Sequence, residues 1–340
     1  MRAFTAALIG ILLASCSTGS AAEGSVPTTL RLGYFPNVTH APALVGIEEG
    51  IFADALGSDI ELQPQAFNAG PEVVEAIFNG ALDASYIGPN PAINAFARSD
   101  GEAIRIVAGT TSGGAALVVR EDITSPEQLA GTTLATPQLG NTQDVALRAW
   151  LLEQGFETDL EGGGEVWISP QANGQALEAF VAGEIDGAWV PEPWATRMVA
   201  DGGGHVLVDE SELWPNGEFV TTHLIVATEF LAEHPDIVKR LLEGHVAAVK
   251  LTNDDPEAAR EVVSSAIEQL SGSALSPEIL GAAWENLEFT VDPIAASLAT
   301  SAQHAADLGL LDDPDLDGIY DLSVLNDVLR EAGEMELPAP

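Results

Sequence analysis

The chain has 340 residues, of which 46% are apolar, 52 are acidic and 12 are basic, so its formal net charge is −40. This apolar content is enough to build sizeable cores, and the length favours two domains over one. The strongly negative field repels nucleic acid and leaves no basic patch for phosphates, which excludes a nucleic-acid partner.

The first segment of the chain is typical of an exported protein. Residues 6–14 form an apolar run that is too short to span a bilayer and has the layout of an export signal. The run ends in LASC at 13–16, which resembles a bacterial lipobox, so we expect lipidation at Cys16, the only cysteine. An ordinary signal peptide with an incidental cysteine is the alternative. We therefore interpret residues 1–29 as a lipoprotein signal peptide and tether, which predicts a location on the extracytoplasmic face of the cell membrane or in a periplasm.

Strands and helices then alternate as far as residue 114. The apolar patterns predict a strand at 30–34, a helix ending at Glu49, a strand at 60–67, a helix at 71–79, a strand within 80–91 and a strand at 104–110. This regular order favours a mainly parallel sheet covered by helices on both faces.

A second cycle begins near Ala116. It is predicted to contain strands at 116–120, 132–136, 166–169, 185–190 and 205–208, and helices starting at Ser125 and covering 145–152 and 176–181. A strand at 222–227 is interpreted as a return path to the first lobe. The pattern from Phe230 onward is helical, with caps or breaks at Pro235, Pro256, Ser276 and Pro293.

One stretch of the chain occurs twice. When residues 75–92 are set against 178–195, Asp83 falls on Asp186 and Tyr86 on Trp189. Each copy is typical of a helix stopped by Gly, a short apolar strand and a loop bent by Pro. Because ligands of open α/β sheets bind beyond the carboxyl ends of strands, two such ends predict one ligand held between two lobes. We expect an α/β, two-lobed protein with a hinge, in which 30–114 and 217–340 form lobe 1 and 115–216 form lobe 2.

The loops that follow the strands form the candidate site. Most combine Gly with Asn, Ser or Thr, and several precede a helix, whose N-terminus offers free N–H groups and partial positive charge. Such loops can hold an anion without Lys or Arg. The residues assigned to ligand binding are Asn37, Thr39, His40, Asn68, Gly70, Tyr86, Asn90, Thr111, Ser112, Asn141, Thr142, Glu192 and Trp194.

Structural roles are the alternative for these residues. Asn141 or Thr142 could be a helix N-cap, Tyr86 a core residue and Glu192 a solvated acid. No His or Cys falls at metal-ligand spacing from His40, so neither a metal nor another cofactor is predicted. The sequence also lacks nucleophile-elbow, zinc-helix and phosphate-loop motifs, so no catalytic residue is assigned.

Three stretches resemble a known family. They are LRLGYFPN at 30–37, GALDASYIGPNP at 80–91 and GEIDGAWVPEPW at 183–194. With the Gly140-Asn141-Thr142 turn and the lipobox, they are similar to solute-binding proteins of ABC importers in the nitrate, sulfonate and taurine group. The resemblance implies a type II periplasmic-binding-protein fold, whose two lobes close on a small solute and dock on a membrane permease driven by an ATPase. It implies a binding protein, not an enzyme, and we expect a monomer.

The resemblance also suggests a class of solute. In sulfonate binders of this type the anion is held by Ser, Thr and Asn side chains and helix-start amides, and the matching positions here are Asn37, Thr39, Asn68, Gly70, Asn90, Asn141 and Thr142. The loop after the lobe 1 strand lacks the Gln or Arg often found there. Glu192 disfavours a dianion and favours an amine, so a taurine-like zwitterion fits better than nitrate.

Other solutes and another class of protein stay open. Nitrate or bicarbonate is one alternative. A pyrimidine precursor of thiamine, stacked on Tyr86 and Trp194 with Glu192 on a ring amine, is a second. A pyrimidine-related enzyme on the same fold, with His40 as its acid or base, is the alternative from a different class.

Overall fold

The computed structural model describes residues 28–312 and 315–340. Cys16 and its proposed lipidation lie outside these residues, so the lipid anchor stays a prediction. Among the residues that are described, no helix has both the length and the apolar character that a membrane span requires.

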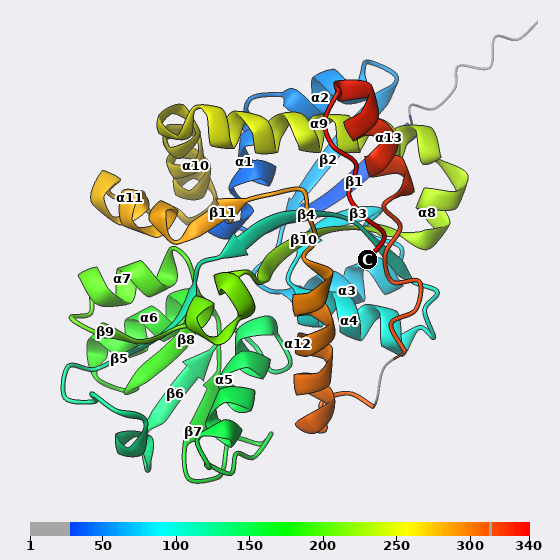
Figure 1. The fold of residues 1–340 in the computed structure, drawn as a ribbon. Helices are drawn as coiled ribbons and strands as arrows, with labels where there is room; N and C mark the ends of the chain where they lie inside the picture. Colours follow the sequence, from blue (N-terminus) through cyan, green and yellow to red (C-terminus); the bar gives the residue numbers. More distant parts are fainter. Residues whose placement is uncertain (1–27, 313–314) are drawn as a thin grey trace, which may run out of the picture.

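Two separate sheets form the centre of the molecule (Figure 1). The first has the strand order β11 (Leu287–Phe289), β4 (Ile104–Gly113), β10 (Val220–Ala227), β3 (Ala84–Ile87), β1 (Thr28–Tyr34) and β2 (Ile60–Ala66). The second has the order β7 (Trp167–Pro170), β6 (Thr133–Thr136), β8 (Gly187–Pro191), β5 (Ala115–Val119) and β9 (His205–Asp209). The α/β fold with two sheets is the one predicted from the sequence.

Strand direction follows from how the chain passes between the sheets. β1 is parallel to β2 and β3, and β10 is antiparallel to both β3 and β4, so β1 to β4 run the same way. In the second sheet β5 is antiparallel to β8 and β9. β5 continues directly from β4, and β10 follows β9 back into the first sheet. Each of these two strands therefore enters its sheet from the other one and runs antiparallel to both of its neighbours. The first crossing turns at Gly113 and Gly114, whose φ angles of 80° and 73° favour glycine.

Helices cover both faces of the first sheet. One face packs on α1 (Ala41–Glu48), α2 (Ile51–Leu56), α9 (Pro235–Asp254), α10 (Pro256–Ser271) and α13 (Ser323–Ala332). The other face packs on α3 (Gly70–Phe78), α4 (Pro89–Arg98) and α12 (Ala295–Asp307). Along β10, Leu224 and Val226 belong to the first core and Ile225 to the second, as the two-residue period of a strand requires. α8 (Thr228–Glu233) and α11 (Pro277–Glu285) complete this half.

The second sheet is covered in the same way. α5 (Thr142–Glu153) packs on one face, and α6 (Asn173–Ala182) and α7 (Trp194–Ala200) pack on the other. The short 3-10 turns are η1 (Val38–His40), η2 (Pro126–Leu129), η3 (Glu210–Leu213) and η4 (Pro215–Gly217). The helix start expected at Ser125 exists as a capping box, but it opens only the short turn η2.

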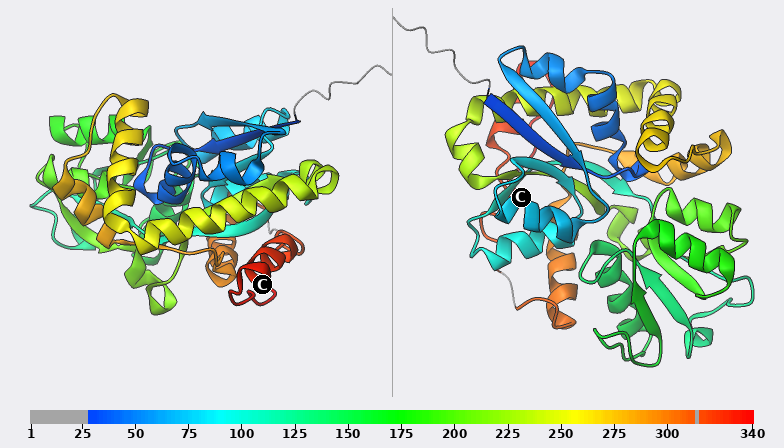
Figure 2. Two further views of the ribbon diagram at one scale, coloured as in Figure 1. Left: turned by 90° about the horizontal axis from the view of Figure 1, so that it is seen from above. Right: turned by 180° about the vertical axis from the view of Figure 1, so that it is seen from behind.

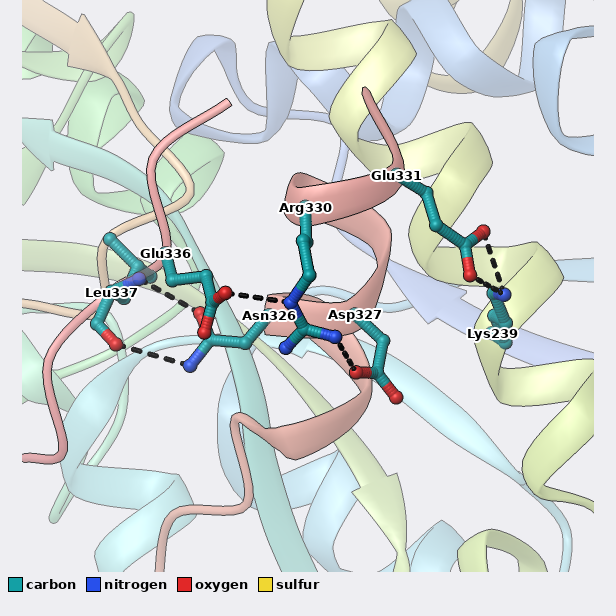
Figure 3. A network of polar contacts seen from close by, with 7 residues as sticks. All are labelled: Lys239, Asn326, Asp327, Arg330, Glu331, Glu336 and Leu337. Atoms are coloured by element: carbon teal, nitrogen blue, oxygen red, sulfur yellow. Dashed lines mark hydrogen bonds and ion pairs between the residues drawn. The ribbon is translucent and has the colours of Figure 1, made fainter. Parts of the chain in front are cut away.

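The C-terminal helices pack on the first half of the molecule (Figure 2). Val238 and Leu241 of α9 share a core with Leu32 of β1, and Leu325 of α13 joins the same core. Figure 3 shows the polar contacts on the surface of α13, where Lys239 reaches Glu331 at 2.7 Å and Arg330 reaches Asp327 and Glu336 at 2.7 Å each. These pairs are exposed, so the buried apolar side chains hold α13 in place.

The aspartate of the duplicated stretch makes the same backbone contacts in both halves. Asp83 comes directly before β3, where its backbone N–H donates to Arg31 O at 3.0 Å and its carboxylate accepts from Arg31 N at 2.8 Å. Asp186 comes directly before β8 and makes the same two bonds with Thr133, both at 2.8 Å. In both halves the aspartate therefore ties the start of one parallel strand to its neighbour.

We expect the aspartate of the first half to contribute more to stability than that of the second. Asp83→Ala leaves the Arg31 N–H without its acceptor and should cost about 2 kcal/mol. Asp186→Ala should cost less, because the Asp186 side chain is 38% exposed, compared with 7% for Asp83. Urea unfolding of residues 24–340 measures both costs, and an equal loss in the two variants would contradict this account.

Candidate functional site

A small cavity lies where the carboxyl ends of the two sheets face each other. Its volume is about 20 Å³, enough for roughly one water molecule. The first half contributes Phe35, Asn37, Thr39, His40, Asn68, Gly88 and Thr221, and the second half contributes Pro137, Asn141, Thr142, Gln143, Asn173 and Pro191. The structure thus brings together six of the residues predicted from sequence: Asn37, Thr39, His40, Asn68, Asn141 and Thr142.

Four helices begin at or beside this cavity. Asn68 precedes α3, Gly88 is the N-cap of α4, Asn141 is the N-cap of α5 and Asn173 is the first residue of α6. None of the four helices has a side-chain hydrogen bond from its N-cap residue. Pro71, Pro89 and Pro91 have no N–H, but the other first N–H groups of these helices lack intrahelical partners and carry partial positive charge. Since no Lys or Arg of the described residues lines the cavity, these groups supply positive potential there.

The start of α5 is fixed by a buried carboxylate. Asp144 accepts hydrogen bonds from Thr136 Oγ1 at 2.8 Å and from Gly140 N at 2.9 Å. It also pairs with Arg148 at 3.1 Å, and both side chains are fully buried. These bonds hold the 140–141 turn against β6, so Asn141 keeps a fixed position at the cavity.

His40 lines the cavity and its imidazole ring is neutral. Burial lowers its pKa to about 3. Its Nδ1 accepts a hydrogen bond from Phe35 N at 3.3 Å, which leaves the proton of the neutral ring on Nε2. His40 is therefore a hydrogen-bond donor without charge at neutral pH.

The two halves touch each other around the cavity. Trp194 Nε1 donates to Asn37 Oδ1 at 3.0 Å, and Gln138 Nε2 donates to Glu72 Oε1 at 3.1 Å. Gly88 lies so close to Thr142 Oγ1 that a Cβ atom at this position would collide with it. The structure is therefore a closed arrangement of the two sheets and their loops.

Three of the predicted ligand residues lie behind the cavity. Tyr86 is fully buried in the first half, and its hydroxyl is 3.0 Å from His245 Nδ1. Asn90 donates to Ser301 O at 3.1 Å, and Thr111 Oγ1 donates to Thr39 O at 2.7 Å. These contacts hold the site loops in position, and none of the three residues lines the cavity.

Of the four that remain, Gly70, Ser112 and Trp194 also lie outside the cavity lining. Ser112 is buried within β4, and Gly70 packs against Pro91 of α4, where a Cβ atom would not fit. Trp194 contacts the lining residue Asn37 but does not line the cavity itself.

The role expected of Glu192 needs correction. It lines a different cavity, of about 390 Å³, between the second sheet, α7 and α11. Its carboxylate accepts hydrogen bonds from Thr196 N at 3.1 Å, Thr196 Oγ1 at 2.9 Å and Asn286 Nδ2 at 2.7 Å, and burial raises its pKa. The carboxylate thus caps α7 and joins the two halves, and it does not point at the cavity among the helix starts.

Several lining residues were missed in the sequence. Asn173 follows β7 and begins a helix, the same pattern that singles out Asn141, so the signal for Asn173 is present in the sequence. Gly88 and Pro191 lie in loops that were predicted to form the site, but neither residue has a polar side chain that would mark it as a ligand contact. Thr221 lies in the returning strand β10, and only the three-dimensional fold places it here.

Known proteins resemble this chain in sequence and in fold. The model of the NMT1-like family matches residues 23–267. The chain belongs to the NMT1-like family. The taurine-binding periplasmic protein of Escherichia coli (strain K12) is 26% identical over 236 residues, covering 68% of this chain and 70% of that protein. The putative aliphatic sulfonates-binding protein of the same organism is 25% identical over 307 residues, covering 89% of each.

The fold of this NMT1-like protein is also found among solved structures. The alkanesulfonate-binding protein SsuA from Xanthomonas axonopodis pv. citri, bound to MOPS, superposes with a TM-score of 0.72 at 18% identity. The match covers 87% of this chain and 98% of that one. The periplasmic-binding-protein fold that the sequence motifs implied is thereby confirmed.

The neutral state of His40 predicts a pH dependence of stability. An unfolded histidine binds a proton near pH 6.5, whereas folded His40 stays neutral down to about pH 3, so its contribution to stability is lost as the pH falls through this window. His40→Gln removes the contribution. Between about pH 4 and pH 6, the slope of the unfolding free energy against pH should decrease by up to about 1.4 kcal/mol per pH unit. Urea unfolding at several pH values measures the slope, and an unchanged slope would show that His40 titrates normally in the folded protein.

Proposed function

We propose that this protein is an extracytoplasmic solute-binding protein of an ABC importer, which captures a small organic anion between its two halves. The observation that carries the proposal is the closed cavity, which is bordered by four helix starts and is lined by neither Lys nor Arg among the described residues. The favoured solute is an aliphatic sulfonate or a taurine-like molecule, in keeping with the relatives that bind taurine and aliphatic sulfonates.

The mechanism is closure around the solute. Residues 30–114 and 217–340 act as one lobe and 115–216 as the other, joined by the crossings at 113–114 and 210–219. The cavity has room for only about one water molecule, so a solute enters when the lobes separate and shapes the cavity as they close. Binding energy shifts the population toward the closed arrangement, which the permease and its ATPase subunits recognise.

The proposed setting is an extracytoplasmic one, in keeping with the periplasmic relative that binds taurine. The protein acts as a monomer that delivers its solute to a membrane permease, tethered to the membrane through lipid on Cys16. Its location is the extracytoplasmic face of the cell membrane or the periplasm, and the short apolar run at 6–14 supports export.

An enzyme on this scaffold is less well supported. The two lysines of α9 are already paired, Lys239 with Glu331 of α13 and Lys250 with Asp254, and neither lysine lines the cavity. His40 has a pKa of about 3, far below the value that suits a general acid or base near neutral pH. Stacking of a pyrimidine on Tyr86 also lacks support, because this ring is fully buried.

A thermal-shift assay of residues 24–340 tests binding. Taurine, alkanesulfonates, nitrate, bicarbonate and thiamine pyrimidines form the panel, and a bound solute at about a hundred times its dissociation constant should stabilise the fold by about 2.7 kcal/mol. A shift with sulfonates or taurine supports the proposal. A shift with the pyrimidines alone would contradict the anion class, and no shift with any solute would contradict the binding function.

Closure is tested by a substitution at the contact between the halves. Gly88→Val places a side chain where Thr142 Oγ1 lies in the closed arrangement, so the variant cannot close fully around the solute. Its solute affinity should fall by at least about tenfold, which corresponds to a loss of about 1.4 kcal/mol or more in binding free energy. Gly281→Val is the matched control, since a Cβ atom at Gly281 meets nothing within 4 Å. Equal affinities of the two variants, measured by calorimetry, would argue against closure around the solute.

A further inference from the structure

Two buried oxygens at the cavity have no partner. Thr142 Oγ1 and Asn173 Oδ1 form no hydrogen bond within the described residues, although their residues are only 5% and 7% exposed and both line the cavity. A buried polar atom left without a partner is costly, and such atoms are uncommon in folded proteins. In the closed arrangement, whatever fills the cavity must satisfy them.

The two oxygens differ in what they require. The Thr142 hydroxyl can donate to an anion, as can the helix-start N–H groups and His40 Nε2. With the Asn173 carboxamide in its orientation in this structure, the oxygen is the buried atom without a partner, and because it can only accept it requires an N–H or O–H donor. A sulfonate or nitrate group carries oxygen acceptors alone and cannot serve it.

Both residues come from the same half of the molecule. Thr142 begins α5 and Asn173 begins α6, so their relation does not depend on how far the halves separate. In a separated arrangement water satisfies Asn173 Oδ1. Closure leaves space for about one water molecule, and a solute that fills this space displaces it.

We propose that Asn173 is a specificity-determining residue, whose amide oxygen selects anions that also carry an N–H or O–H donor a few bonds from the anionic group. This inference rests on the proposed function and narrows its solute class to aminoalkyl- and hydroxyalkyl-sulfonates. Glu192 cannot be the reason for a taurine-like solute, because its carboxylate is bonded to Thr196 and Asn286. The Asn173 oxygen favours the same kind of solute for a different reason.

Calorimetry with three sulfonates of similar size tests the inference on the unmodified protein, residues 24–340. Taurine carries an ammonium group, 2-hydroxyethanesulfonate a hydroxyl and 1-propanesulfonate a methyl group at the equivalent position. The first two should bind at least about tenfold more tightly than the third, because the third leaves the Asn173 oxygen without a donor. Equal affinities for all three would overturn the inference and leave the proposed function intact, whereas binding of none would count against both.

Two variants locate the effect at Asn173. Asn173→Leu removes the acceptor at similar size, so the preference over 1-propanesulfonate should shrink by about tenfold. Asn173→Asp adds a negative charge and should raise the ratio of taurine to 2-hydroxyethanesulfonate affinity, because the ammonium carries a positive charge. Asn79→Asp, an exposed position at the end of α3, is the matched charge control and should leave the ratio unchanged. A preference that survives intact in Asn173→Leu would overturn the assignment.

Discussion

Backbone N–H groups at the starts of helices are the constraint on which this structure depends. An α-helix leaves its first N–H groups without partners, and here the starts of α3, α4, α5 and α6 meet at one cavity without side-chain caps. Such an arrangement in a chain with a net charge of −40 concentrates positive potential where no basic side chain lies. The N–H groups require an acceptor, and a small anion supplies one.

The two sheets place these helix starts opposite each other. Each half ties its parallel strands together through an aspartate, Asp83 or Asp186, at the start of the central strand. The carboxyl ends of the strands then lie at one edge, where the helices begin. Because the chain crosses between the sheets only at that edge, through Gly113–Gly114 and again before β10, the two edges face each other. The polar residues between them, Asn37 and Trp194 among them, then meet across the gap.

Much of this arrangement could be predicted from sequence because it depends on local patterns. The alternation of strands and helices and the repeated aspartate are visible in the chain, and the rule that ligands bind after strands pointed to loops whose residues Asn141, Thr142 and His40 line the cavity. The start of α4 was missed because Pro89 was interpreted as a turn, although proline is well suited to the first turn of a helix. Glu192 was misplaced because its contacts with Thr196 and Asn286 depend on how α7 and α11 pack. Tyr86 reaches His245 across 159 positions, a contact that no local pattern contains.

If a solute closes the two lobes on each other, the distance between the lobes must shorten when the solute binds. Without Cys16, residues 24–340 contain no cysteine, so spin labels can be placed by Asn79→Cys on α3 and Glu178→Cys on α6, both exposed positions. Double electron–electron resonance then reports the distance distribution between the labels with and without taurine. We expect a broad distribution for the free protein that narrows to one shorter distance when taurine is bound. Identical distributions under saturating taurine, with binding confirmed by calorimetry, would contradict closure by the solute.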